Sequence, residues 1–151
     1  MDITKINNLF NSSTNSDLET QELGIQFSKF IKNGDVITLN GDLGSGKTTF
    51  VKGVLMGLGY KDEVTSPTYT LINEYKTKYN IIHLDCYREK DINRWLNIGL
   101  IDYFNNENIL FIEWPNHIKN ILFSRKIIEL NFEIKDLNER LICMREIESY
   151  E

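Results

Sequence analysis

Alanine is absent from this sequence of 151 residues, and proline and cysteine occur only twice each. Because alanine is the best helix former, its absence lowers the intrinsic helix propensity, and tertiary packing has to stabilise the helices instead. Two cysteines, Cys86 and Cys143, cannot build a disulfide framework. We interpret them as small buried apolar residues of a protein in a reducing compartment.

Long apolar runs are also missing, since no stretch approaches the roughly 20 residues that cross a membrane. Segment 1–14 has no apolar core followed by a small-residue cleavage site, so no secretory signal is indicated and a cytoplasmic location is expected. Acidic residues outnumber basic residues by 22 to 17, for a net charge of -5. This balance disfavours a broad electropositive surface for nucleic acid.

The length predicts one domain over residues 1–151, in which polar residues 1–16 are a mobile or edge-lying lead-in. Apolar periodicity predicts helices at 17–32, 47–58, 91–97 and 100–104. A Ser16–Glu19 capping box begins the first helix, and Asn33-Gly34 ends it. Short apolar runs predict strands at 36–39, 69–74, 81–84, 109–112, 126–134 and 141–147, of which the second and third form a hairpin. This order predicts an α/β protein, a three-layer sandwich with a mixed, mostly parallel sheet.

The strongest motif is Gly41–Thr48, which fits G-x-x-x-x-G-K-[ST] without exception. It follows a predicted buried strand and opens a predicted helix, where glycines allow backbone N–H groups to converge on an anion. The Lys47 ammonium would reach the β- and γ-phosphates, and the Thr48 hydroxyl would bind Mg²⁺. A purely structural glycine-rich turn is the alternative, which the complete motif disfavours. The sequence therefore predicts a P-loop that binds a nucleoside triphosphate, without distinguishing ATP from GTP.

Two acids, Asp85 and Glu113, directly follow predicted apolar strands. If those strands run parallel to the strand before the P-loop, both carboxylates lie at the edge of the sheet where α/β proteins bind ligands. Either acid could hold the metal or orient an attacking water. Alternatively, both are solvated loop residues.

Segment Thr65–Thr68 places three hydroxyl groups on a loop after the P-loop helix. Such loops are often ordered by a γ-phosphate and Mg²⁺, although a turn fixed by proline is an equal alternative. Arg88 could neutralise phosphate charge, or it could pair with Asp85 or Glu89 on the surface.

Other candidates are interpreted as structural. His83 lies within an apolar strand and is expected to be a core histidine with satisfied ring nitrogens. Trp114 is expected to pack in the core, with contact to the site or to a partner as the alternative. Tyr69, Tyr75 and Tyr79 are expected to pack on the sheet rather than to stack on bases.

Taken together, five segments of the chain resemble the bacterial TsaE family, formerly called YjeE, in order and spacing. They are GDLGSGKTT (41–49), SPTYTL (66–71), HLDCYR (83–88), IGLIDYF (98–104) and IEWP (112–115). The family is the ATPase component of tRNA threonylcarbamoyladenosine (t6A) biosynthesis. The resemblance covers roughly residues 15–135. Many NTPases share the P-loop alone, but the combination of segments is specific to this family.

The resemblance implies a P-loop NTPase-like fold that binds ATP with Mg²⁺. The nucleotide-binding residues that it implies are Asp42, Gly44, Ser45, Gly46, Lys47, Thr48 and Thr49, with Thr20 near the adenine. Metal-binding positions are matched by Thr48, Glu113 and Asp85, and catalytic positions by Asp85, Lys47 and Glu113. Asn116 stands where many members have Glu or Gln, and nothing is transferred beyond about Asn131.

The resemblance also implies partners. Members hydrolyse ATP slowly alone and associate with the TsaD and TsaB subunits. TsaD makes the transfer to adenosine 37 of tRNA, so tRNA contact is expected only through the complex, and no membrane is involved.

Three other functions remain open from the residues themselves. A small-molecule kinase would usually carry a lid of clustered arginines, but the five arginines here do not cluster in the sequence. A GTPase switch would carry Asn-Lys-x-Asp, which is absent. A nucleotide-dependent binding module would release no phosphate even with partners present.

Overall fold

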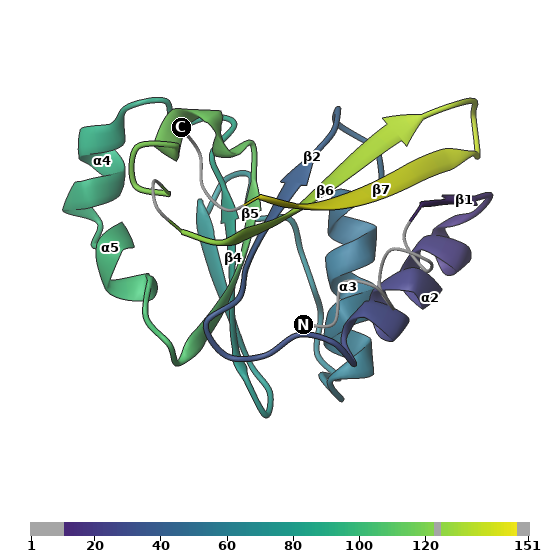
Figure 1. Cartoon of the computed structure of the whole chain (residues 1–151), viewed down its shortest axis with the longest axis horizontal. Coiled ribbons are helices and arrows are strands. Elements are labelled where there is room, and N and C mark those ends of the chain that lie inside the picture. The colour runs from purple at the N-terminus through teal and green to yellow at the C-terminus, as the bar shows by residue number, and fades with distance from the viewer. Residues whose placement is uncertain (1–10, 123–124, 148–151) are drawn as a thin grey trace.

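A mixed β-sheet forms the centre of the computed structural model, which describes residues 11–122 and 125–147. Within these residues the sheet has seven strands in the order β1-β7-β6-β2-β5-β4-β3 (Figure 1). The strands are β1 (Ser12–Thr14), β2 (Val36–Asn40), β3 (Ile72–Lys76), β4 (Asn80–Asp85), β5 (Asn108–Glu113), β6 (Ile127–Ile134) and β7 (Arg140–Ile147). Parallel pairing joins β6, β2, β5 and β4, and antiparallel pairing adds β3 at one edge and β7 and β1 at the other.

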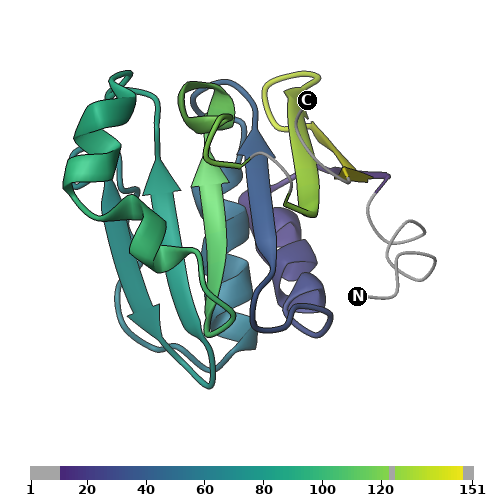
Figure 2. The same cartoon turned by 60° about the vertical axis from the view of Figure 1, so that its left-hand side comes forward.

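Helices cover both faces of the sheet (Figure 2). Helices α2 (Asp17–Phe27) and α3 (Lys47–Gly57) lie on one face, while α4 (Ile92–Asn97), α5 (Leu100–Tyr103) and the 3₁₀ helix η1 (Pro115–Ile118) lie on the other. Each face buries its own apolar cluster, one around Phe50 and Phe111 and one around Trp95 and Ile112. Burial of both faces explains why β2, β4 and β5 are nearly continuous apolar runs. The predicted three-layer α/β sandwich is confirmed.

The two helices on the first face are in backbone contact. A Cβ atom added to Gly53 would lie 2.1 Å from the carbonyl oxygen of Gln21, and one added to Gly24 would lie 2.3 Å from that of Phe50. Only glycine at these two positions permits such a close approach. As a result, α2 packs directly against the helix that follows the glycine-rich loop.

Several predicted boundaries were wrong for local reasons. The first hairpin strand begins at Ile72 rather than at residue 69, because Leu71 adopts a φ of 68° and donates its N–H to the carbonyl oxygen of Pro67. Helix α2 ends at Phe27, before Asn33-Gly34, and Ser28 is its C-cap. Half of the predicted capping box is confirmed, since Ser16 is the N-cap and accepts a hydrogen bond from the backbone N–H of Glu19 at 3.1 Å, whereas the Glu19 carboxylate accepts one from the backbone N–H of Asn15 at 2.6 Å.

The polar lead-in contains the short edge strand β1, which pairs with β7. Residues 1–10 of that predicted segment lie outside the described residues. No disulfide is formed, and Cys86 is buried as predicted, whereas Cys143 is only partly buried. Among the helices of residues 11–122 and 125–147, none combines the length and the apolar character that a bilayer span requires.

Candidate functional site

Strand register brings the two predicted acids together. Asp85 is the last residue of β4 and Glu113 the last residue of β5, and the two residues are direct partners in the parallel ladder. Glu113 also pairs with Leu39 of β2, one residue before the end of that strand. Because β2, β4 and β5 are parallel, their carboxyl ends share one edge of the sheet, and the glycine-rich loop after β2 lies at that edge.

The loop turns sharply from β2 into α3. Gly46, the N-cap of α3, has a φ of 104°, which favours glycine. Lys47 is buried, and its ammonium group donates hydrogen bonds to the backbone carbonyls of Gly41 and Asp42. The same nitrogen lies 4.6 Å from the centre of the Trp114 ring. In this structure the lysine is therefore held against the loop and one aromatic face.

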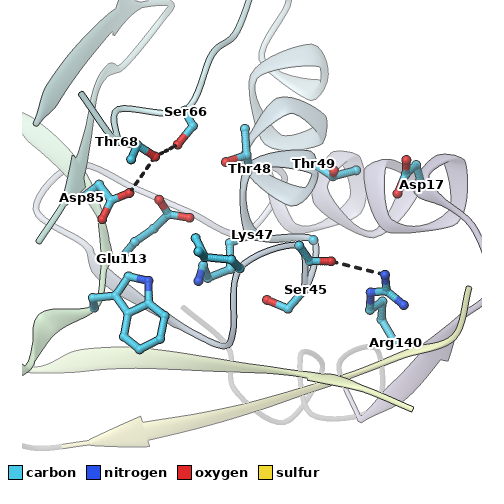
Figure 3. A pocket seen from close by; sticks show the side chains of 14 residues that line it. Asp17, Ser45, Lys47, Thr48, Thr49, Ser66, Thr68, Asp85, Glu113 and Arg140 are labelled. Atoms are coloured by element: carbon cyan, nitrogen blue, oxygen red, sulfur yellow. Dashed lines mark hydrogen bonds between the residues drawn. The ribbon is translucent and has the colours of Figure 1, made fainter. Parts of the chain in front are cut away.

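A cavity of about 460 Å³ opens over the loop (Figure 3). Its lining residues are Asp17, Leu43, Gly44, Ser45, Gly46, Lys47, Thr48, Thr49, Ser66, Thr68, Asp85, Glu113, Trp114 and Arg140. Figure 3 shows Asp85 and Glu113 at one end, Arg140 and Asp17 at the other, and Lys47 between them. The end that contains Asp85 and Glu113 is called the acidic end below, and the glycine-rich loop lines the cavity between the two ends.

The acidic end contains two buried carboxylates. Asp85 and Glu113 are each only 3% exposed, so neither is a solvated loop residue. Asp85 accepts hydrogen bonds from the Thr68 hydroxyl at 3.2 Å and from the backbone N–H of Tyr87 at 2.9 Å. Burial raises the pKa of Asp85; the hydrogen bond from Tyr87 opposes this rise and the nearby Glu113 carboxylate adds to it.

The same burial shifts the pKa of Lys47 in the opposite direction to that of Asp85. Burial lowers the pKa of Lys47, and the carboxylates of Glu113, Asp85 and Asp42 partly offset that effect. Asp85, Glu113 and Lys47 are thus three charged side chains that lie close together and are shielded from water. Such a set gains stability from a further cation that neutralises the carboxylates.

A metal in this cavity would need ligands from outside the protein. Among residues 11–122 and 125–147, no group of three or more His, Cys, Asp or Glu side chains could hold a metal ion. Mg²⁺ is characteristically bound by one or two carboxylates together with phosphate oxygens and waters. Thr48, Asp85 and Glu113 all line the cavity, so its oxygen donors fit Mg²⁺ delivered with a phosphorylated ligand.

Two residues predicted for nucleotide binding lie outside this cavity. The Asp42 side chain is exposed and does not line it, and only its carbonyl oxygen contacts Lys47, at 3.5 Å. Thr20 is buried and bonds the Thr14 hydroxyl at 2.8 Å. It lines an adjoining cavity of about 430 Å³ that shares Asp17, Gly46 and Arg140 with the first.

Sequence reasoning missed Arg140, the first residue of β7. Its guanidinium donates a hydrogen bond to the carbonyl oxygen of Gly44 at 3.2 Å and others to carbonyls of Asp136, Leu137 and Glu139. The arginine therefore ties the β6–β7 turn to the glycine-rich loop, across 96 positions of sequence. No local pattern marks it, because the contact arises only when β6 pairs with β2.

Other sequence interpretations need correction. His83 is buried, but neither ring nitrogen has a hydrogen-bond partner among the described residues, so it is not a satisfied core histidine. Tyr69 is 83% exposed instead of packing on the sheet, and the Arg88 guanidinium lies over its ring at 4.7 Å. Trp114 packs against the apolar cluster around Trp95 and Ile112, as expected, and it also lines the cavity, where the Lys47 ammonium lies over its ring.

The fold and this edge of the sheet define a P-loop NTPase-like α/β sandwich. A family model described as threonylcarbamoyl adenosine biosynthesis protein TsaE matches residues 14–142. The tRNA threonylcarbamoyladenosine biosynthesis protein TsaE of Rickettsia typhi is 37% identical over 133 residues, which cover 87% of this chain and 91% of that protein. The protein of the same name from Bacillus subtilis is 42% identical over 105 residues, which cover 69% of this chain and 65% of that protein.

A solved structure agrees with these relatives. The crystal structure of Bacillus subtilis YdiB is similar with a TM-score of 0.76 and 32% sequence identity, covering 91% of this chain and 84% of that one. The chain therefore belongs to the TsaE family, a family of tRNA t6A biosynthesis.

Proposed function

We propose that this protein binds ATP with Mg²⁺, hydrolyses it slowly, and acts in the cytoplasm as an accessory subunit with TsaB and TsaD in the threonylcarbamoylation of tRNA adenosine 37. One observation supports this proposal above the others. The lysine and threonine of the complete glycine-rich motif line the same cavity as two buried carboxylates from neighbouring strands.

The loop and α3 supply the binding groups for phosphate. The amino end of α3 presents unpaired backbone N–H groups and the positive end of a helix dipole. Lys47 adds a full charge, and it would exchange its bonds to the carbonyls of Gly41 and Asp42 for phosphate oxygens. Arg140, which lines the far end of the cavity, adds a second charge there.

The acidic end of the cavity supplies the groups for hydrolysis. Asp85 is held by hydrogen bonds from Thr68 and the backbone of Tyr87, so its free lone pairs can orient a water for in-line attack. Glu113 and Thr48 would hold Mg²⁺, which neutralises charge on the phosphates when bound. Both carboxylates are only 3% exposed, so water screens their charges weakly and their attraction for a cation is strong. The two negative charges also repel each other unless a cation binds between them.

The charge of the chain suits a subunit that docks on protein. A net charge of -5 does not favour direct binding of a polyanion, so we propose that tRNA is contacted through TsaD and TsaB. The curated relatives carry names from the same pathway, which supports a place for this chain in the t6A assembly.

The decisive experiment measures phosphate release from ATP with Mg²⁺, with and without TsaB and TsaD. We expect slow release by the chain alone, faster release with both partners, and none when Mg²⁺ is removed by a chelator. Nucleotide binding without any release, even with partners, would make the chain a binding module. Tight GTP binding that excludes ATP would instead favour a switch GTPase, and phosphorylation of a metabolite would favour a kinase.

A further inference from the structure

His83 is a fully buried polar side chain in the middle of β4. Neither ring nitrogen has a hydrogen-bond partner among the described residues. A buried donor or acceptor that stays unpaired destabilises a fold by about 1–3 kcal/mol. An apolar residue of similar size would avoid that cost, so packing alone does not account for a histidine here.

The sheet directs this ring toward the candidate site. His83 and Asp85 are two positions apart on β4, so their side chains project from the same face. His83 pairs with Phe111 of β5, which makes Glu113 its diagonal neighbour on that face. The result is a distance of 3.6 Å between Nε2 of His83 and a carboxylate oxygen, Oε2, of Glu113.

We propose that His83 is a positioning residue for Glu113. In this arrangement the Nε2–H group of His83 donates a hydrogen bond to Oε2 of Glu113, which fixes the rotation of the carboxylate at the edge of the cavity. The present 3.6 Å separation needs to shorten by only about 0.5 Å to reach hydrogen-bond distance. The proposal rests on the proposed function, in which Glu113 holds the metal, because histidines and carboxylates of this kind set the orientation of metal-binding groups.

The contact is tested first without nucleotide, by nitrogen NMR of the ¹⁵N-histidine-labelled protein. We expect the Nε2-protonated tautomer at His83 and a change in its Nε2 shift in the Glu113→Gln variant. His117, a partly buried histidine of η1 that does not line the cavity, serves as the internal control whose shifts should not change. An Nδ1-protonated ring, or a shift that ignores Glu113→Gln, would overturn the proposal.

Three substitutions then separate positioning from packing. Glutamine can place an amide N–H near the position of Nε2, asparagine only near that of Nδ1, and leucine neither. We expect His83→Leu and His83→Asn to slow ATP hydrolysis by about 10–100-fold, the loss typical of groups that orient a metal ligand, while the Kd for ATP changes less than threefold. His83→Gln should restore most of the rate. The melting temperature should not follow this order.

The outcomes distinguish this inference from the proposed function. Wild-type hydrolysis in His83→Leu, or an equal loss in His83→Gln and His83→Asn, would overturn the positioning role. If the wild-type protein releases no phosphate under any condition, the proposed function fails, while the NMR experiment still decides whether His83 donates to Glu113. If His83→Leu does not fold, the glutamine and asparagine variants decide the matter.

Discussion

The candidate site has two halves that are built in different ways. The glycine-rich half is continuous in sequence, since Gly41–Thr49 forms the loop that follows β2 and the first turn of α3. The other half is assembled from three separate strands, which contribute Asp85, Glu113 and Arg140. In the first half, local backbone geometry sets the positions of the groups; in the second, the order of the strands sets them. A change of strand order would leave the first half intact and disperse the second.

Loss of the lysine should have the greatest effect on binding, because it removes the only buried cation of the continuous half. We expect Lys47→Ala to weaken ATP binding by about 10²-fold, since truncating one partner of a buried charged contact costs about 3 kcal/mol. Isothermal titration calorimetry measures the change. Lys52→Ala, an exposed lysine of the same helix, is the matched control and should bind as the wild type. Unchanged affinity in Lys47→Ala would place the nucleotide elsewhere.

The two acids should affect hydrolysis instead of binding. We expect Asp85→Asn and Glu113→Gln each to slow phosphate release by about 10²-fold, the usual effect of removing a positioned catalytic group. The Kd for ATP should change only a few-fold, because the loop and its lysine remain. Asp102→Asn, an exposed acid of α5, is the control. If both site variants hydrolyse ATP at the wild-type rate, the assembled half has no part in the reaction.

Arg140 should give a smaller effect, because a single hydrogen bond, to the carbonyl oxygen of Gly44, links it to the glycine-rich loop. We expect Arg140→Ala to weaken ATP binding by about three- to tenfold, corresponding to roughly 1 kcal/mol. Lys135→Ala removes a positive charge from the same hairpin, where the lysine pairs only with exposed Glu133 among the described contacts. Equal weakening in both variants would show that the hairpin acts through its net charge, and that the link to Gly44 is unimportant.

The sequence predicts the continuous half well for a physical reason. Glycines with positive φ, a lysine and a threonine at fixed spacing lie within one short segment, so the motif can be identified from local sequence alone. The two acids could be proposed because they end apolar strands, but their mutual register required the structure. Arg140 could not be predicted from the sequence. The pairing of β6 with β2 brings the β6–β7 turn to the glycine-rich loop, and no sequence pattern near Arg140 indicates that pairing.

The secondary structure also divides into features that the local sequence predicts and features that it does not. Apolar runs gave the core strands almost to the residue, because strands covered on both faces leave a strong compositional signal. Boundaries that depend on one unusual backbone conformation were missed, as at Leu71, where a positive φ delays the start of β3. The end of α2 was missed as well, because apolar spacing continues through Phe30 after the helix has stopped.

The glycine contacts between α2 and α3 restrict which walls of the cavity can move. Because α2 and α3 are in backbone contact at Gly24 and Gly53, we expect Asp17 and the first turn of α3 to move together. We therefore expect any widening of the cavity to come from its other walls, the β6–β7 turn and the segment between α3 and β3. A single extra methyl group at Gly53, which does not itself line the cavity, would clash with the backbone of Gln21, push the two helices apart and displace the glycine-rich loop from the rest of the site.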